Sequence, residues 1–206
     1  MHISMLSTDR HNLGYMSLRD VARVQPGYLS RTSVHAVPSG THRLIQAKDV
    51  SPQHGLQANS LIRFKPERNP ELYRVSRGDI LLTARGKNHW ACLIGLDLSN
   101  VLASSVFYII RPLEGVVLPG YLAWCLNQPD MQAAIESTSC GTGIGYITRS
   151  KIEHLQMVVP PIDMQRRVVE TMNLWQRQQS IQARLDRKCE QLIQAICRQA
   201  VAPEKE

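Results

Sequence analysis

Cysteine is scarce in this sequence, and its spacing is irregular. The 206 residues include five cysteines, at positions 92, 125, 140, 189 and 197. No pair has the Cys-x-x-Cys spacing of zinc sites and redox pairs, and the odd number argues against a disulfide framework. We therefore expect free thiols in a reducing cytoplasm.

Long apolar runs are absent as well. No run approaches the roughly 18 residues that a membrane-spanning helix needs. The first seven residues, MHISMLS, lack the apolar core of a signal peptide. The hydrophobic fraction of 43% is nevertheless ordinary for a folded domain. These features predict a folded cytoplasmic protein that makes no membrane contact.

Motifs of catalysis and cofactor binding are also missing. None of the seven histidines belongs to an HExxH motif or is accompanied by a Cys-x-x-Cys motif, as metal sites would require. The sequence also lacks a GxSxG motif and a Walker lysine. Glycines at 141, 143 and 145 superficially resemble a dinucleotide loop, but no strand leads into them. The double proline is flanked by Val159 and Ile162, so it cannot grip a flipped adenine as an amino-methyltransferase motif does. We predict a non-catalytic chain with no metal and no cofactor of its own.

Positive charge, by contrast, is in excess. The net charge is +7 and the isoelectric point is near 9.4. Residues 1–162 contain 16 Lys and Arg against 11 Asp and Glu, an excess of five, whereas residues 163–206 contain 8 against 6. A basic surface suits phosphate binding, because each neutralised phosphate releases counterions. The plain alternative is a charge that only keeps the protein in solution.

The hydrophobic pattern over the first 161 residues indicates a mixed α+β domain with short, mostly antiparallel strands. Apolar runs bounded by Gly and Pro predict strands, and a serine-capped helical turn is expected at 17–24. Residues 80–83 and 91–96 should form a hairpin, and two helices should flank Pro129. The predicted strands are 43–46, 61–64, 80–83, 91–96, one within 101–110, and 155–159; the predicted helices are 121–126 and 131–135.

The pattern changes after Pro160 and Pro161, which end the last strand. Residues 162–206 contain no glycine or proline before Pro203, and apolar side chains recur three, four or seven residues apart. We predict a long helix with a partly polar, glutamine-rich stripe that either packs along its own domain or, as we favour, pairs with another helix. We also expect residues 1–162 to fold without it. The predicted pairing residues are Met172, Trp175, Leu185, Leu192 and Ile196.

One segment points to a family. Residues 147–169, ITRSKIEHLQMVVPPIDMQRRVV, resemble the end of a target-recognition domain in the specificity subunits of type I restriction–modification systems. Weaker motifs precede it in the family's order: Gly78-Asp79-Ile80-Leu81, Ala103–Val106, a helix over 119–126 and the glycine loop 141–145. The resemblance spans about residues 15–200. One difference is that Asp163 and Met164 precede Gln165, where the family has an acidic residue beside the glutamine.

The resemblance implies a half-length subunit, with one recognition domain (1–161) and one spacer helix (162–206). Such a chain would bind double-stranded DNA at a bipartite site and direct an adenine methyltransferase subunit, which itself binds S-adenosylmethionine. A nuclease subunit could join. The chain would form a homodimer or pair with a second half-subunit. The alternative is a degenerate recognition domain that acts as a protein-interaction adaptor or inhibitor in a phage-defence complex.

Two basic, polar loops are the candidate DNA-reading surfaces. Residues 85–89 offer cations for phosphates and an asparagine able to pair bidentately with adenine. Residues 139–151 place polar and cationic side chains around three glycines. Each loop could instead be a solvated hairpin tip or a flexible connector. The predicted DNA-binding residues are Arg43, Gln46, Lys48, Arg85, Lys87, Asn88, His89, Thr142, Tyr146, Arg149 and Lys151.

Overall fold

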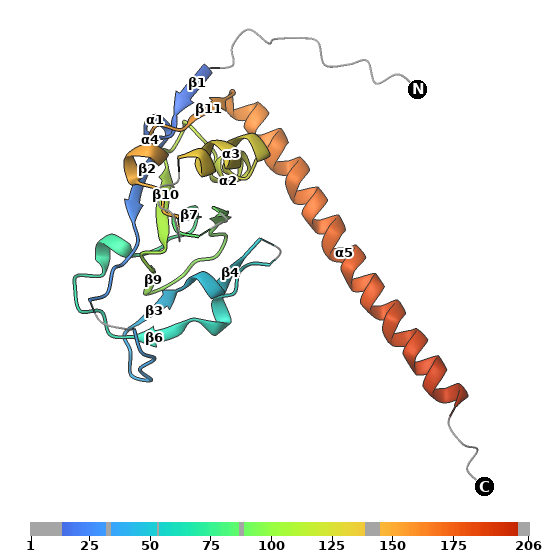
Figure 1. Ribbon diagram of the computed structural model, residues 1–206. Helices are drawn as coiled ribbons and strands as arrows, with labels where there is room; N and C mark the ends of the chain where they lie inside the picture. Colours follow the sequence, from blue (N-terminus) through green and yellow to red (C-terminus); the bar gives the residue numbers. More distant parts are fainter. Residues whose placement is uncertain (1–13, 32–33, 53, 87–88, 139–144, 202–206) are drawn as a thin grey trace, which may run out of the picture. The chain divides into compact units, whose positions relative to one another are not determined.

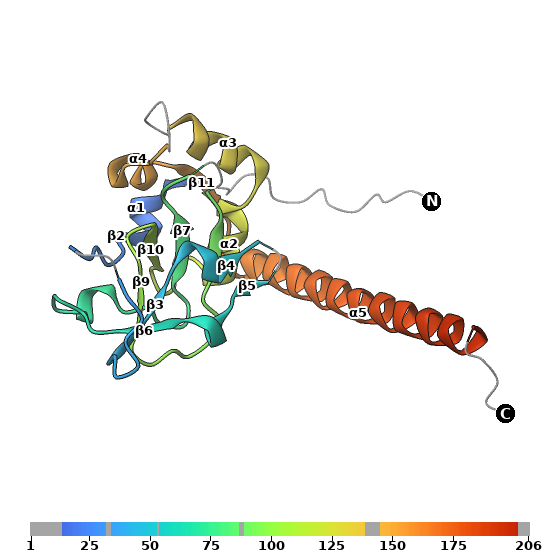
Figure 2. The ribbon, with the colours of Figure 1, turned by 60° about the horizontal axis from the view of Figure 1, so that its bottom comes forward.

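The computed structural model describes residues 14–31, 34–52, 54–86, 89–138 and 145–201. It confirms a mixed α+β fold with mostly antiparallel strands and a long C-terminal helix, α5 (Ile162–Ala200) (Figures 1 and 2). The chain divides into two compact units, Met1–Arg166 and Arg167–Glu206. We call the first unit the body. Its helices and strands are β1 (Gly14–Ser17), α1 (Leu18–Val21), β2 (Ala22–Pro26), β3 (His42–Ile45), η2 (Ala47–Asp49), β4 (Val50–Ser51), β5 (Gly55–Leu56), η3 (Ala58–Ser60), β6 (Ile62–Phe64), η4 (Glu71–Tyr73), β7 (Ile80–Thr83), β8 (Ala91–Leu93), β9 (Val101–Ala103), β10 (Phe107–Pro112), α2 (Pro119–Leu126), α3 (Pro129–Ser137), α4 (Arg149–Glu153) and β11 (Gln156–Val159).

The larger sheet has the strand order β2-β10-β7-β8, and all its pairs are antiparallel. Strand β7 lies in its middle, where Ile80, Leu81 and Leu82 are fully buried. Continuous burial suits the unbroken apolar run that the sequence shows at this point. The predicted hairpin between this run and the next strand is confirmed as β7 and β8, although β8 ends at Leu93.

The smaller sheet has the order β6-β3-β9, in which β3 and β9 are parallel. The chain crosses from the larger sheet to this one at Gly27 and Tyr28. The Gly27 N–H donates to Phe107, next in the ladder of β10, while the Tyr28 N–H donates to Ala103 at the end of β9, at 2.6 Å. A side chain at Gly27 would stand 2.7 Å from the Ala103 carbonyl oxygen, so only glycine fits the crossing.

Strand β2 is the main element that the sequence prediction missed. The serine cap and helical turn are present, as Ser17 and α1, but the helix ends at Val21 and the chain continues as β2. Every residue of β2 pairs with β10. A partner more than eighty residues away along the chain therefore decides the conformation here, and local propensity does not report it.

The end of the body depends on one buried amide. The Gln165 side chain, in the first turn of α5, is fully buried. Its Oε1 accepts from the Leu118 N–H at 2.8 Å, and its Nε2 donates to the carbonyls of Pro160 at 2.8 Å and Val116 at 3.2 Å. Residues 163–166 thus belong with the body. A cut after residue 162 would remove the partner of these three backbone groups, so we expect residues 1–162 to fold less stably than residues 1–166. Among the described residues, no helix is both long and apolar enough to cross a membrane.

Candidate nucleic-acid interface

Two loop segments that are sixty residues apart in the sequence meet beside β7. Arg85 and Tyr146 form an antiparallel bridge, the Gly86 N–H donates to Gly145 at 3.0 Å, and the Ile147 N–H donates to Ala84 at 3.0 Å. We call residues 84–86 and 145–147 the basic loop pair. It joins the two loops that the sequence singled out separately.

Two side chains of the basic loop pair, those of Arg85 and Tyr146, face outward, whereas Ala84 and Ile147 are buried. Arg85 is exposed, and Tyr146 is 51% exposed. Gly86 has a backbone φ of 110°, a value that residues other than glycine rarely adopt. Arg85 forms no ion pair with a described residue. An exposed guanidinium beside an exposed phenol can contact a phosphate and a base or sugar at the same time.

Tyr108 of β10 contacts the basic loop pair through its side chain. Its hydroxyl donates to the Ile147 carbonyl at 3.0 Å. Burial raises the pKa of Tyr108, while the positive charges of Arg149 and Arg85 act in the opposite direction. Arg149 begins α4 only two residues after Ile147, so it lies next to the basic loop pair.

Arg149 and Lys151 lie on the short helix α4, and both make local contacts. The Arg149 Nε pairs with the Glu153 carboxylate at 2.7 Å, and the Lys151 Nζ donates to the Thr138 carbonyl at 2.7 Å. Arg149 remains more than half exposed despite its partner. A phosphate would compete with Glu153 for this guanidinium, so Arg149 offers less net charge than Arg85.

His89 does not belong to this surface. It is 3% exposed, and its Nδ1 lies 2.9 Å from the Thr83 carbonyl oxygen. The prediction that its side chain reads DNA is not supported, because the ring is turned into the protein. Lys87, Asn88 and Thr142 lie outside the described residues.

Arg43, Gln46 and Lys48 form a separate group. Arg43 lies on β3, Lys48 is exposed on η2, and the Gln46 N–H caps η2 by donating to Asp49. Figures 1 and 2 place β3 and α4 toward opposite ends of the body. Those predicted DNA-binding residues that the structure describes therefore lie in two places, one at the basic loop pair with α4 and the other on β3 and η2.

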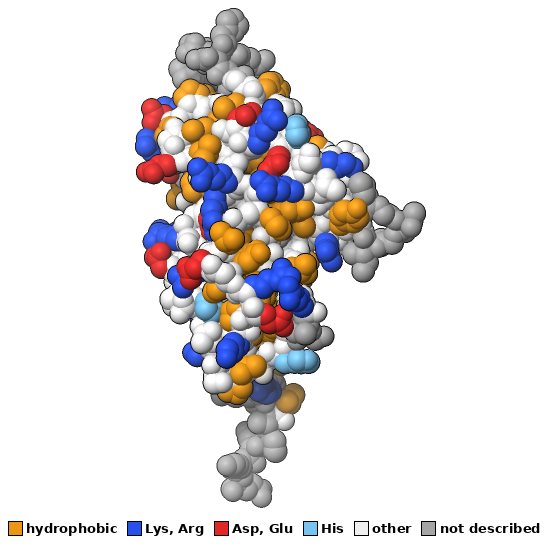
Figure 3. Space-filling model, turned by 90° about the vertical axis from the view of Figure 1, so that its left-hand side faces the viewer, with side chains coloured by type: hydrophobic (Ala, Val, Ile, Leu, Met, Phe, Trp, Pro, Cys, Tyr) orange, Lys and Arg blue, Asp and Glu red, His pale blue; other side chains and the backbone are white. Residues whose placement is uncertain are grey.

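The sequence prediction missed cations on α1 and β2. Arg19 on α1 and Arg23 on β2 are exposed, and α4 packs against both elements. Figure 3 shows Lys and Arg side chains scattered over this side of the body, with fewer acidic ones between them. Recognising β2 as a strand would have indicated that the Arg23 side chain is exposed. Side chains alternate between the two faces of a strand, and the neighbours Ala22 and Val24 are buried.

Apolar side chains of α5 are exposed in this chain. Met172 is half-buried, and Trp175, Leu185, Leu192 and Ile196 are each more than half exposed. Leu174, which is 68% exposed, was not predicted. Leu174 precedes Leu185 by eleven residues, close to three full turns, so the two side chains lie on the same side of the helix. Trp175 precedes Leu185 by ten residues, so its side chain is rotated by about 80° around the helix axis from that of Leu185. Leu174 is thus a better member of the stripe than Trp175.

Comparison with known proteins gives matches in structure only. No protein-family model and no curated protein sequence matches this chain. The S subunit of a type I restriction–modification system from M. genitalium matches with a TM-score of 0.56 and 13% identity, over 85% of this chain. The HsdS subunit from Thermoanaerobacter tengcongensis matches with a TM-score of 0.58 and 16% identity, over 92% of this chain.

A third match comes from a structure that describes complex assembly and conformational transition of the type I R-M system. It has a TM-score of 0.65 and 16% identity over 92% of this chain. This chain covers 42–45% of the three matched chains. At these identities the comparison establishes the fold. This chain has the fold of less than half of a type I restriction–modification S subunit.

Among the described residues, no group of three or more His, Cys, Asp or Glu could hold a metal ion.

Proposed function

We propose that this protein is a half-length DNA-specificity subunit. Its body would read one half of a bipartite site, and α5 would act as the spacer that pairs two such bodies. The specificity subunit would direct an adenine methyltransferase, which supplies the S-adenosylmethionine and the chemistry, and a nuclease subunit could join the same complex. The body would thus contribute binding and no catalysis.

The observation that carries this proposal is the fold correspondence. Matches to two S subunits extend over 85% and 92% of this chain while covering less than half of each S subunit. The described residues supply one recognition body and one long helix. A site made of two half-sites would need a second recognition body.

The basic loop pair and α4 suit the DNA contact. Arg85 has no ion pair with a described residue, so a phosphate does not have to displace a carboxylate from it. Tyr146 adds an exposed ring and hydroxyl next to that cation. We assign phosphate contacts to Arg85, Arg149 and Lys151, and assign Tyr146 to a base or sugar edge.

The test is DNA binding by the full chain over a salt series. We expect weak binding of duplex DNA whose log affinity falls linearly with log salt, and Arg85→Ala should reduce that slope by about 0.9, the value for one phosphate contact. Arg198→Ala, a cation near the end of α5, is the matched control and should leave the slope unchanged. No binding even at low salt, or an affinity independent of salt, would favour the adaptor function instead.

A further inference from the structure

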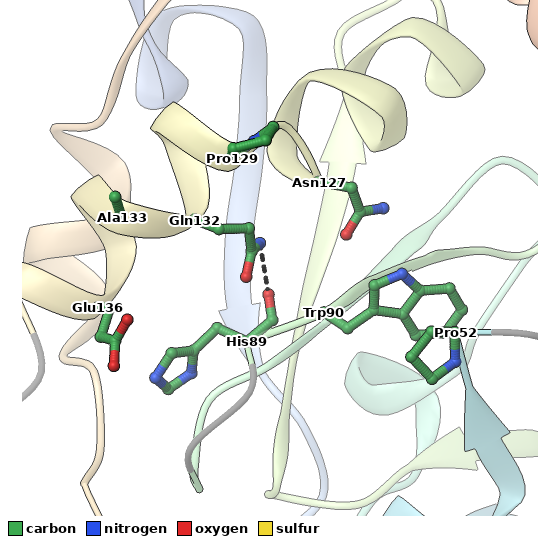
Figure 4. Close-up of a pocket in the computed structure, with 8 residues that line it drawn as sticks. All are labelled: Pro52, His89, Trp90, Asn127, Pro129, Gln132, Ala133 and Glu136. Carbon is green, nitrogen blue, oxygen red and sulfur yellow. Dashed lines mark hydrogen bonds between the residues drawn. The ribbon is translucent and has the colours of Figure 1, made fainter.

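A hollow of about 440 Å³ opens between α3, the start of β8 and the β4–β5 turn. Its volume falls within the range of about 300–1,000 Å³ typical of ligand pockets. Figure 4 shows His89 and Glu136 toward one end and Trp90 with Pro52 toward the other. The DNA-binding proposal uses none of the lining residues, which are Pro52, His89, Trp90, Asn127, Pro129, Gln132, Ala133 and Glu136.

His89 presents a hydrogen-bond acceptor to this hollow. Its Nδ1 is 2.9 Å from the Thr83 carbonyl oxygen, and because a carbonyl can only accept, Nδ1 carries the proton. In the neutral form of the ring, Nε2 then carries a lone pair. That nitrogen forms no hydrogen bond with a described residue, although His89 as a whole is 3% exposed. A buried ring held by one nitrogen, with the other unpartnered, is arranged to receive a donor.

Two further acceptors lie on the same face of α3. The Gln132 Nε2 is used within the protein, since it donates to the carbonyls of His89 at 2.8 Å and Leu126 at 2.6 Å. This fixes the amide and leaves its Oε1 as an acceptor. Glu136, one turn further, is exposed and forms no ion pair with a described residue. Asn127 adds nothing, because its amide is bonded to Ala91 and Ala123.

The other side of the hollow is apolar. Trp90 supplies an indole, and Pro52 and Pro129 supply rings without donors. None of the described residues that line the hollow is Lys or Arg, although residues 1–162 carry five more positive than negative charges. The local charge is thus opposite to that of the surrounding chain, and a phosphate would be repelled by Glu136. Nucleic acid is therefore a poor occupant.

We propose that this hollow binds an arginine side chain presented by a partner protein. The guanidinium would meet Glu136, the His89 Nε2 and the Gln132 Oε1, and its fan of donors matches several separate acceptors better than a lysine ammonium does. The apolar stem would lie along Trp90 and Pro52. This binding site is independent of DNA reading.

The test uses the full chain labelled with 15N and follows the Trp90 indole N–H signal, identified with Trp90→Phe. The probe is N-acetyl-arginine methylamide, and its citrulline analogue, which has the same shape without the charge, is the matched control ligand. We expect a saturable shift with a dissociation constant on the order of 1 mM, and no shift with citrulline. Glu136→Gln should weaken binding at least fivefold, whereas Glu114→Gln, an exposed carboxylate outside the hollow, should not.

Ala133→Arg gives a second variant. Ala133 is exposed on α3, so the substitution should not disturb the core, and its own cation should compete with the probe and abolish the shift. The proposal is overturned if the arginine probe produces no saturable shift, if citrulline binds equally well, or if Glu136→Gln has no effect. A shift of the Trp90 signal by duplex DNA would overturn it in favour of a nucleic-acid site.

Discussion

At the scale of single residues, Gln165 connects three parts of the body. Its amide satisfies the backbone groups of Val116, Leu118 and Pro160, and the side chain has no exposure to solvent. A buried donor or acceptor that loses its partner costs about 1–3 kcal/mol. Gln165 therefore links the first turn of α5 to the loop before α2 by hydrogen bonds.

We predict that Gln165→Ala lowers the free energy of unfolding by about 3 kcal/mol, because it leaves these backbone groups buried without partners. Gln165→Glu should be comparably harmful, since a carboxylate would face the carbonyls of Val116 and Pro160. Urea denaturation followed by circular dichroism measures both. Gln156→Ala, at an exposed glutamine on β11, is the control. Equal stability of the Gln165 and Gln156 variants would contradict this role.

The buried thiol of Cys92 makes a second prediction at this scale. Burial raises the pKa of Cys92 to about 11, from an ordinary value near 9. Between these values the folded protein holds a proton that the unfolded chain has lost, so stability falls as the pH rises from about 9 to 11. The loss attributable to Cys92 should approach about 2 kcal/mol, and Cys92→Ala should remove that part. Denaturation at pH 8 and pH 10.5 would show it, and an identical pH dependence in the variant would refute it.

At the scale of elements, the end of the body should lie within α5. A protein ending at Ile162 lacks Gln165, whereas one ending at Arg166 retains it. We expect the longer form to keep a cooperative thermal transition and the shorter form to melt about 6–12 °C lower, as a loss of about 3 kcal/mol predicts for a domain of this size. Differential scanning calorimetry compares the two. If both forms melt alike, the four residues contribute nothing to the body.

Elements with a strong local pattern could be predicted from the sequence, and the others could not. The apolar run at β7 and the periodic stripe of α5 indicate their conformation from the local sequence alone. The predicted bounds of these two elements are therefore close to the observed ones. Strand β2 depends on β10 for its form. The bridge between Arg85 and Tyr146 likewise depends on the folded body, so both loops could be identified but not their contact. His89 sits in a basic loop by sequence, and only the structure shows that its ring is buried.

At the scale of the whole molecule, α5 would decide whether one body or two can act together. It has 39 residues, a length of about 58 Å. Leu174, Leu185 and Leu192 are exposed along it. A second α5, arranged antiparallel, would cover these side chains and relate two bodies by a twofold axis. Two identical bodies would then recognise an interrupted palindrome, with half-sites more than one helical turn of DNA apart.

We predict that the protein forms a dimer through α5 and that Leu185→Asp with Leu192→Asp makes it a monomer, because two unpaired charges would be buried in the contact. Ser180→Asp with Gln194→Asp adds the same charge on the opposite side of the helix and should leave the dimer intact. Light scattering over a concentration series measures the mass of each form. A wild type that remains monomeric at high concentration, alone and with a methyltransferase subunit, would rule out the pairing. The stripe on α5 would then serve another partner, and a single body would read a single half-site.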